Sequence, residues 1–355
     1  MIPELGLIEG FYGRQWTWAA RARVASFLAS HAYRFYFYAP KGDAYLRKRW
    51  QEPHPAEDAA ELAAFAAHCR AAGLRFGVGL SPYEIYRDFS ADTRAALARK
   101  LEFLAGIGTD YLAILFDDMR GDLPELAARQ VEILHWVGEH TPGQRLFLCP
   151  TYYSDDPLLD SIFGARPAGY LEQLGRTLDP SIELFWTGEE IAPPELSAGH
   201  LMRVTETLHR QPFLWDNYPV NDTARLSRFI HVRAFTGRPA DIAGHIRGHA
   251  INPALQPVLS LIPALTLVES YRAGSAYQYS QAFRRAAAEV LGTELAERVR
   301  EDLMLLQNIG LERLTSAQRA QLENHYRDVD HEAAREIMDW LTGAYLTPED
   351  IALTQ

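Results

Sequence analysis

Short apolar runs rich in β-branched and aromatic residues alternate with longer amphipathic segments over about the first 270 residues of the chain. In segments such as 17–33, 56–73 and 91–108, apolar residues recur at spacings of three and four, which predicts helices with one buried face. Strand and helix patterns in regular alternation indicate βα units around a parallel sheet. The predicted strands are 6–13, 34–40, 75–82, 111–119, 145–153, 182–188, 212–219 and, with the weakest pattern, 241–248.

Eight strand–helix pairs over this length match a (β/α)8 (TIM) barrel in both number and size. An open doubly wound sheet is the main alternative, but no Gly-x-Gly-x-x-Gly turn follows the first predicted strand. From about residue 275 the strand patterns stop and only helical patterns remain. We therefore predict an α/β fold with a (β/α)8 catalytic domain at 1–272. A small all-helical C-terminal region at 273–355 would serve packing or oligomerisation.

Composition narrows the class of protein. The chain has 355 residues, of which 48% are hydrophobic and 23% charged, as in soluble globular proteins. Its formal net charge of −11 opposes binding to nucleic acid or to an anionic membrane. Cys69 and Cys149 are too few for a disulfide framework and lack metal-ligand spacing. With no leader pattern and no apolar run of membrane-spanning length, we expect a cytoplasmic protein, unless the chain has been trimmed.

Polar and aromatic residues cluster at the carboxyl ends of the predicted strands, which in a barrel meet on one rim. Taken singly, each has an ordinary structural explanation, such as a helix cap, a surface charge or a core aromatic. Together, acids, amides, hydroxyls and tryptophans are what a carbohydrate site needs, because hydroxyls require polar partners and sugar faces require aromatic platforms. The segments concerned are 9–13, 38–41, 117–118, 150–153, 186–188, 215–217 and 252–253.

Two adjacent acids, Asp117 and Asp118, end one predicted strand. Side chains of successive strand residues diverge. We therefore expect that the pair cannot easily flank one glycosidic bond at the roughly 5–5.5 or 6.5–9.5 Å separations of ordinary two-carboxylate glycosidases. A substrate that carries its own nucleophile, a 2-acetamido group, needs one carboxylate to orient the amide and a neighbour to protonate the leaving oxygen. The pair therefore favours substrate-assisted glycoside hydrolysis.

Seven motifs occur in order between about residues 5 and 270: LIEGFYGRQW, YFYAPKGDAYLRKRW, LFDDM, CPTYY, FWTGEE, LWDNYPVND and INPALQP. They closely resemble the catalytic domain of glycoside hydrolase family 84, the O-GlcNAcases and related bacterial β-N-acetylglucosaminidases. The resemblance implies that Asp117 orients the acetamido group and stabilises an oxazoline-like intermediate. It implies that Asp118 is the general acid and then the general base.

The resemblance also implies a set of sugar-binding residues, without cofactor or metal. The acetamido group would be held by Tyr153, Thr187, Trp215 and Asn217 and by a backbone group at Ile191. The ring hydroxyls would be held by Gly10 through its backbone and by Lys41, Asp222 and Asn252, with Asp222 distinguishing gluco from galacto sugars. The chain departs from the family pattern after Lys41 and at Tyr152, where a glutamate is common, which leaves substrate breadth open.

The leading hypothesis is thus a retaining exo-β-N-acetylglucosaminidase whose partner is a terminal β-linked GlcNAc, including GlcNAc on Ser or Thr of glycoproteins. An enzyme for free GlcNAc oligosaccharides or cell-wall fragments is not separated from it by the sequence. A catalytically inactive GlcNAc-binding barrel is the alternative from another class. A metal-dependent hydrolase is disfavoured because His200, His209 and His245 form no clear ligand set with carboxylates. The family includes dimers, so a homodimer stays open.

Overall fold

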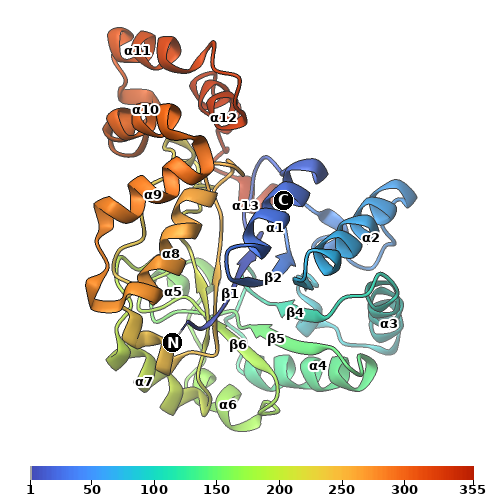
Figure 1. Ribbon diagram of the computed structural model, residues 1–355. Coiled ribbons are helices and arrows are strands. Elements are labelled where there is room, and N and C mark those ends of the chain that lie inside the picture. Colours follow the sequence, from blue (N-terminus) through green and yellow to red (C-terminus); the bar gives the residue numbers. More distant parts are fainter. Residues whose placement is uncertain (1) are drawn as a thin grey trace.

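Eight parallel strands form a closed barrel in the computed structural model, which describes residues 2–355 apart from the side chains of residues 353 and 354 (Figure 1). Each strand pairs with its neighbours in the chain, and β1 closes the ring against β8. This confirms the predicted (β/α)8 fold. The strands are β1 (Glu4–Ile8), β2 (Tyr33–Tyr38), β3 (Arg75–Leu80), β4 (Tyr111–Leu115), β5 (Arg145–Cys149), β6 (Glu183–Trp186), β7 (Phe213–Asp216) and β8 (Gly248–Ile251).

The strands are shorter than predicted because the polar residues at their carboxyl ends leave the ladder. The prediction for the eighth strand, 241–248, is wrong. Most of that segment forms the 3-10 helix η4 (Ala240–His245), and the strand follows at Gly248–Ile251. The fully buried Gly248–Ile251 run pairs with both β7 and β1, whereas Asp241 and Arg247 remain exposed. A strand buried on both faces is predominantly apolar, and its one histidine, His249, is paired with Asp216, whereas the earlier segment carries exposed charges.

Helices cover the outside of the barrel (Figure 1). Three of them lie within the predicted amphipathic segments: α1 (Trp18–Ala29), α2 (Ala56–Ala71) and α3 (Ala91–Gly106). The connection from β7 to β8 carries only short 3-10 turns, η3 (Leu226–Arg228) and η4. No described helix is both long enough and apolar enough to cross a membrane. The remaining barrel helices are α4 (Leu126–His140), α5 (Leu158–Phe163), α6 (Tyr170–Thr177), α7 (Ala198–Leu208) and α8 (Leu261–Ala273).

Phenylalanines fill the barrel interior beneath the carboxyl-end rim. Phe37 and Phe147 have ring centroids 5.1 Å apart, and Phe147 and Phe213 lie 5.2 Å apart. Glycines on adjacent strands make room for these rings, since a Cβ on Gly77 would lie 2.4 Å from the Phe37 ring. Phe185 extends the cluster upward to Trp215, with centroids 5.4 Å apart. The rim therefore stands on a packed floor and not on an open pore.

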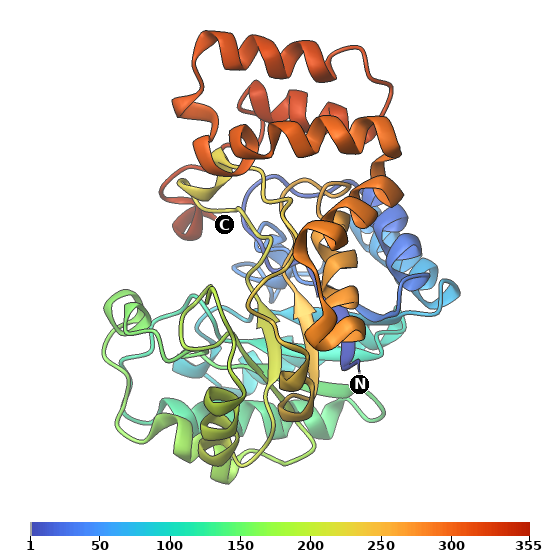
Figure 2. The same ribbon diagram turned by 60° about the vertical axis from the view of Figure 1, so that its left-hand side comes forward.

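The C-terminal helices stand on one side of the barrel, with α10 to α12 farthest from it in both ribbon views (Figure 1, Figure 2). The carboxylate of Glu336 accepts hydrogen bonds from the backbone N–H groups of Val258 (2.8 Å) and Leu259 (3.0 Å), just before α8. These helices are thus tied to the loop after β8. The division of the chain at residues 272 and 273 stays a prediction. The helices are α9 (Tyr279–Leu291), α10 (Thr293–Met304), α11 (Ser316–Tyr326), α12 (Glu332–Leu341) and α13 (Ile351–Thr354).

Candidate active site

A cavity of about 210 Å³ opens at the carboxyl ends of the barrel strands. It brings together the predicted site residues except Lys41. Those that line it are Gly10, Asp117, Asp118, Tyr153, Thr187, Ile191, Trp215, Asn217, Asp222 and Asn252. Residues separated by more than 200 positions thus meet because parallel strands end on one rim. Their roles toward a sugar stay predictions.

The two acids converge on one cation. Strand β4 ends at Leu115, so the acids lie in the following turn, where Asp118 has a positive φ of 58°. Lys41 Nζ lies 2.5 Å from Asp117 Oδ2 and 3.4 Å from Asp118 Oδ2. The expectation that the two side chains diverge is therefore wrong. Alternation of side chains applies within a strand, and the left-handed backbone at Asp118 removes it.

Lys41 lies behind the acids and does not line the cavity, with 2% of its side chain exposed. Burial acts to lower the pKa of Lys41, but the charges of Asp117 and Asp118 outweigh it and the pKa is raised. The ammonium group therefore remains charged and holds the acid pair in place. Its implied contact with a sugar hydroxyl stays a prediction.

Asp117 is the more buried of the two acids, with 8% of its side chain exposed against 22% for Asp118. Burial raises the pKa of Asp117 against the opposing effect of Lys41, and the neighbouring Asp118 charge raises it further. Its Oδ1 atom is buried and receives no hydrogen bond from the described part of the chain. Leaving a buried acceptor unpaired costs about 1–3 kcal/mol. A ligand that donates an N–H group here would recover that cost.

Tyr12 connects two acids of the site, although we did not predict it as a site residue. Its hydroxyl donates to Asp118 Oδ2 (2.8 Å), and its backbone N–H donates to Asp222 Oδ2 (2.8 Å). Burial and the Asp118 charge raise the pKa of Tyr12, so the hydroxyl keeps its proton. The signal was present in the sequence, since Tyr12 belongs to the polar segment that follows the first strand.

The opposite wall is built around Asn217. Its Nδ2 donates to the Ile191 carbonyl (2.8 Å), while its Oδ1 accepts from Trp215 Nε1 (3.1 Å) and Asn252 Nδ2 (3.0 Å). Asn252 Oδ1 in turn accepts from the Gly10 N–H (3.1 Å). A Cβ on Gly10 would lie 2.0 Å from the Trp215 ring, so only glycine fits there. Loops after β6, β7, β8 and β1 are thus joined into one wall.

A buried ion pair supports that wall from below. Arg238 binds both carboxylate oxygens of Asp216 at 2.8 Å, and His249 Nε2 lies 2.9 Å from Asp216 Oδ2. Burial acts to raise the pKa of Asp216, but Arg238 and His249 hold it well below its usual value. Asp216 lies between Trp215 and Asn217 in the chain. The ion pair therefore fixes the backbone that presents these two side chains.

Asp222 has an unusual titration. Burial raises its pKa to about 6, against the opposing effect of the Tyr12 N–H and with a further increase from Asp118. Its carboxyl group therefore changes charge near neutral pH. As a carboxylate it offers acceptors to two hydroxyl groups, which suits the implied contact with the outer hydroxyls of a sugar.

The loops after β5 and β6 hold the remaining predicted residues. The Thr187 hydroxyl donates to the Glu190 carbonyl (3.0 Å), which shapes the turn that presents Ile191 to the cavity. Tyr153 is held from its backbone, whose carbonyl accepts from the Thr187 N–H (3.0 Å). Tyr152 is fully buried and donates to the Gly164 carbonyl (2.6 Å). The tyrosine at position 152, where the family commonly has a glutamate, therefore changes the interior of the loop and not the lining of the cavity.

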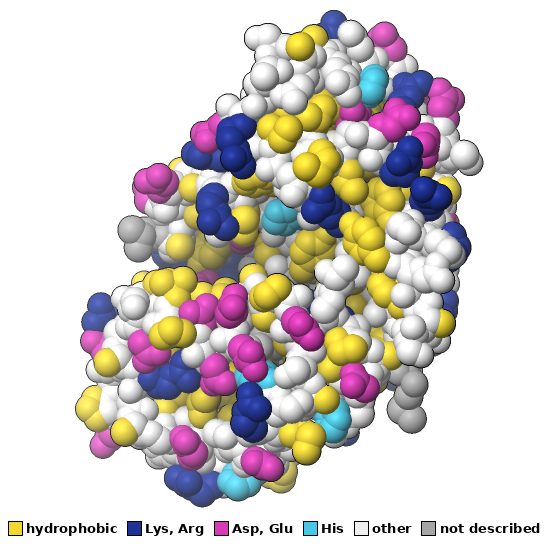
Figure 3. Space-filling view, turned by 90° about the vertical axis from the view of Figure 1, so that its left-hand side faces the viewer, with side chains coloured by type: hydrophobic (Ala, Val, Ile, Leu, Met, Phe, Trp, Pro, Cys, Tyr) yellow, Lys and Arg dark blue, Asp and Glu magenta, His cyan; other side chains and the backbone are white. Residues whose placement is uncertain are grey.

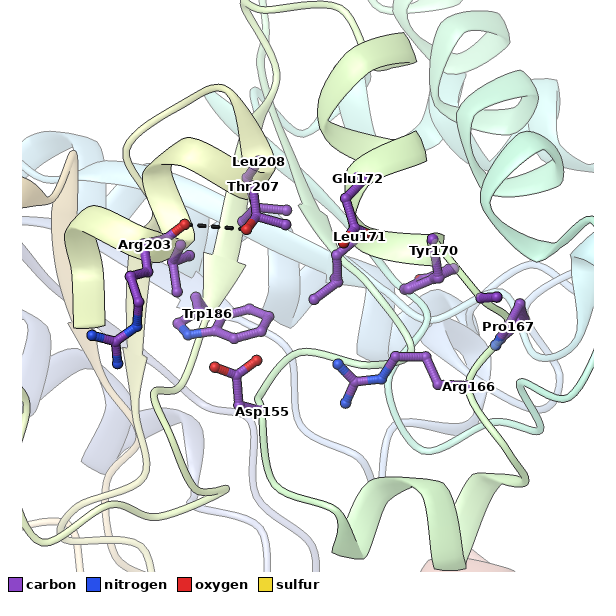
Figure 4. A pocket seen from close by; sticks show the side chains of 13 residues that line it. Asp155, Arg166, Pro167, Tyr170, Leu171, Glu172, Trp186, Arg203, Thr207 and Leu208 are labelled. Atoms are coloured by element: carbon purple, nitrogen blue, oxygen red, sulfur yellow. Dashed lines mark hydrogen bonds between the residues drawn. The ribbon is translucent and has the colours of Figure 1, made fainter. Parts of the chain in front are cut away.

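Another cavity, of about 410 Å³, lies between α6 and α7 and holds none of the predicted site residues (Figure 4). The Trp186 indole and the Asp155 carboxylate border it. The indole N–H of Trp186 donates to His200 Nε2 (3.0 Å), so His200 takes part in core packing. Within residues 2–355 no group of His, Cys, Asp and Glu side chains is arranged to hold a metal ion.

A closed βα barrel with paired acids, amides and aromatic walls at its carboxyl end defines a glycoside hydrolase type of fold and site. The model of the β-N-acetylglucosaminidase family, whose members include the O-GlcNAcases of glycoside hydrolase family 84, matches residues 5–307. The chain belongs to this family.

Individual relatives agree with that assignment. The chain is 27% identical over 276 residues to Protein O-GlcNAcase of Rattus norvegicus and, equally, to that of Mus musculus. Each match covers 75% of this chain and 30% of the relative, so the chain spans less than a third of the length of these curated relatives. A solved variant of the O-GlcNAc hydrolase of Thermobaculum terrenum superposes with a TM-score of 0.80 and 26% identity, covering 96% of this chain and 81% of that one.

Proposed function

We propose that the chain is a retaining exo-β-N-acetylglucosaminidase that releases terminal β-linked GlcNAc by substrate-assisted catalysis. Family membership supports the reaction class. The cavity of about 210 Å³ is smaller than the roughly 300–1,000 Å³ of pockets for drug-sized ligands, which fits one sugar unit and removal from a chain end. The names of the curated relatives, Protein O-GlcNAcase, suggest GlcNAc on protein Ser or Thr as the substrate.

In the first half of the proposed reaction, Asp117 Oδ1 accepts the acetamido N–H and so increases the negative charge on the acetamido carbonyl oxygen. That oxygen attacks the anomeric carbon, and the bond from this carbon to the leaving oxygen breaks. Asp118 gives its proton to the leaving oxygen. The product is a cyclised, oxazoline-like sugar, whose positive charge Asp117 stabilises.

In the second half, Asp118 removes a proton from water, and the oxygen of that water attacks the anomeric carbon. The bond to the acetamido oxygen breaks and the amide is restored. Two successive inversions at one carbon leave the product with the starting configuration. Asp118 ends protonated, as it began, because the proton taken from water replaces the one given to the leaving oxygen.

The observation that carries this proposal is the unequal use of the two oxygens of Asp117. Oδ2 is bound by Lys41 at 2.5 Å, while the buried Oδ1 has no hydrogen-bond partner within residues 2–355. A charged acceptor with one open position suits an amide N–H. Asp118 is more exposed and is held by Tyr12, which suits a group that must meet both a leaving oxygen and water.

Kinetics on two substrates tests the assignment. Asp118→Asn should reduce kcat/KM by about 10²–10⁴-fold for a GlcNAc glycoside with a poor alkyl leaving group. It should have much less effect on an activated aryl glycoside, which departs without protonation. Asp117→Asn should impair both substrates. Asp328→Asn, which replaces an exposed acid in the turn between α11 and α12, is the control and should affect neither.

If kcat/KM falls equally for both substrates in Asp118→Asn, the assignment of Asp118 as the general acid is wrong. Proton NMR of the first product formed should show the β anomer. An inverted product, or a glycosyl ester on either aspartate detected by mass spectrometry, would refute the substrate-assisted mechanism.

A further inference from the structure

A larger groove of about 610 Å³ lies beside the sugar cavity. Ala192, Asn217, Val220 and Leu226 line both, so these residues form the ridge between the two spaces. We call this space the side groove. Its other polar lining residues are Tyr218, Arg225, His231, Arg233, Thr236, Tyr279 and Gln307, together with the ion-paired Arg238.

The side groove carries unbalanced positive charge. No Asp or Glu lines it, although the chain as a whole has a formal net charge of −11. Arg238 is neutralised by Asp216 at 2.8 Å. Within residues 2–355, neither Arg225 nor Arg233 has a carboxylate at ion-pair distance. Burial lowers the pKa of His231, so the two arginines supply the charge at neutral pH.

Arg233 is held in position without losing its charge. Its guanidinium group donates to Asn308 Oδ1 and contacts Met304 Sδ at 3.5 Å, and both partners belong to the segment at the end of α10. Gln307 Oε1 accepts the backbone N–H groups of Val232 and Arg233, each at 2.9 Å. The C-terminal helices therefore contribute one wall of the side groove and hold the guanidinium group of Arg233 in place there.

One face of the molecule carries a hollow with basic side chains at its border. Figure 3 shows a hollow lined largely by hydrophobic side chains, with basic and histidine side chains along its upper border. Acidic side chains gather below the hollow.

The position of the groove indicates which part of a substrate it would meet. The sugar cavity has room for one ring, and the more exposed acid, Asp118, faces the leaving oxygen in the proposed reaction. Whatever is attached to that oxygen must lie outside the cavity. Ala192 and Leu226 border both spaces, so the side groove adjoins the wall around Asn217. A leaving group that extends across this ridge would reach the side groove.

We propose that the side groove binds an acidic polypeptide segment next to the sugar-bearing residue, with its carboxylates paired to Arg225 and Arg233. This inference rests on the proposed function, with a protein as the leaving group. Guanidinium groups bind carboxylates through paired N–H donors, which gives orientation as well as charge. The apolar ridge residues Ala192, Val220 and Leu226 would pack against the peptide between the sugar and the acidic side chains.

Two glycopeptides that differ only in charge test the proposal. Both carry GlcNAc on one serine, with Glu and Asp on either side in the first and Gln and Asn in the second. We expect kcat/KM for the acidic peptide to exceed that for the neutral one by roughly 3- to 10-fold at low salt, since partly exposed ion pairs are weak. The preference should shrink as ionic strength rises.

The double variant Arg225→Gln, Arg233→Gln should abolish the preference. Arg225→Gln alone should reduce it, which keeps the test valid if loss of the Arg233 contact to Asn308 impairs folding. Arg176→Gln replaces an exposed arginine on α6 outside both spaces and is the matched control. It should leave the ratio of the two kcat/KM values unchanged.

Failure of this inference differs from failure of the proposed function. If an aryl GlcNAc glycoside is hydrolysed but both peptides are cleaved equally, or the double variant keeps the preference, the side groove does not bind acidic peptides and the enzyme assignment stands. If the aryl glycoside is not hydrolysed, the proposed function fails. Calorimetric binding of the same two peptides to the Asp118→Asn variant then tests the side groove separately. Tighter binding of the acidic peptide would support the proposal that the groove binds acidic peptides, and equal binding would overturn it.

Discussion

Replacing Lys41 by methionine tests how the acid pair is held. The change removes the cation that lies 2.5 Å from Asp117 and 3.4 Å from Asp118, while the methionine keeps most of the buried volume. Asp117 would then be buried beside a like charge with no compensating cation. Its pKa, already raised by burial, should rise further, because Lys41 is the largest influence that lowers it.

The expected magnitude follows from the geometry. At an effective dielectric constant of about 20, charges 2.5 Å apart attract by roughly 7 kcal/mol, which is an upper limit before desolvation of the ammonium is subtracted. Removing one partner of a buried pair usually costs about 3–5 kcal/mol. Asp117 can avoid most of this cost by taking up a proton. The loss of stability relative to wild type should therefore be small at low pH and grow as pH rises through the Asp117 pKa.

The pH dependence of activity should follow the raised pKa of Asp117. The proposed mechanism needs Asp117 as an anion, so the acid limb of the pH profile of kcat/KM should move to higher pH in Lys41→Met. Lys48→Met, an exposed lysine on the same loop, is the control. Both variants would be assayed on an aryl GlcNAc glycoside and melted at several pH values. An unshifted acid limb, or a loss of melting temperature that does not depend on pH, would refute the role assigned to Lys41.

Two further predictions concern the walls of the cavity. The pKa of Asp222 is about 6, and its ionised form is the better hydrogen-bond acceptor, so KM should rise as pH falls below 6. Asp222→Asn should raise KM and remove this pH dependence. Steady-state kinetics at pH 5 and pH 8 would measure both effects. A KM that is flat in wild type across this range would count against the contact. Gly10→Ala places a Cβ 2.0 Å from the Trp215 ring and should raise KM about 10-fold or more by displacing the cavity wall. Gly106→Ala is the control, because there is open space around its Cβ, and it should not change KM. Equal KM values for the two variants would contradict the packing argument.

Local patterns were sufficient for most of the architecture. Helix periodicity located α1 to α3 to within a few residues, and the count of strand–helix pairs gave a barrel. The eighth strand was misplaced because Gly248–Ile251 is only four residues long and includes a glycine and a histidine, which are weak strand signals. A pattern that short carries little periodicity. Its identity depends on the two strands that it joins, which are distant in sequence.

The functional site was also predicted only in part from the sequence. Eight of the ten predicted residues that line the cavity lie in the polar segments at strand ends, which meet because the carboxyl ends of parallel strands share a rim. The other two, Ile191 and Asp222, were implied only by the family resemblance. The orientation of Asp117 and Asp118 was misjudged, since it depends on where β4 ends and on a backbone angle at Asp118. The contact of Tyr12 with Asp118 joins residues 106 positions apart and leaves no trace in local pattern.

The order and spacing of its residues determined that this chain forms a βα barrel and which loops carry its chemistry, because these properties follow from periods of two and 3.6 residues and from short motifs. Only the tertiary structure decided that one lysine binds both acids, that one oxygen of Asp117 is left open, and that two arginines beside the cavity lack acidic partners. Those facts depend on which distant side chains are brought within a few ångströms. Electrostatic and hydrogen-bond energies vary steeply over that range, and no one-dimensional pattern encodes it.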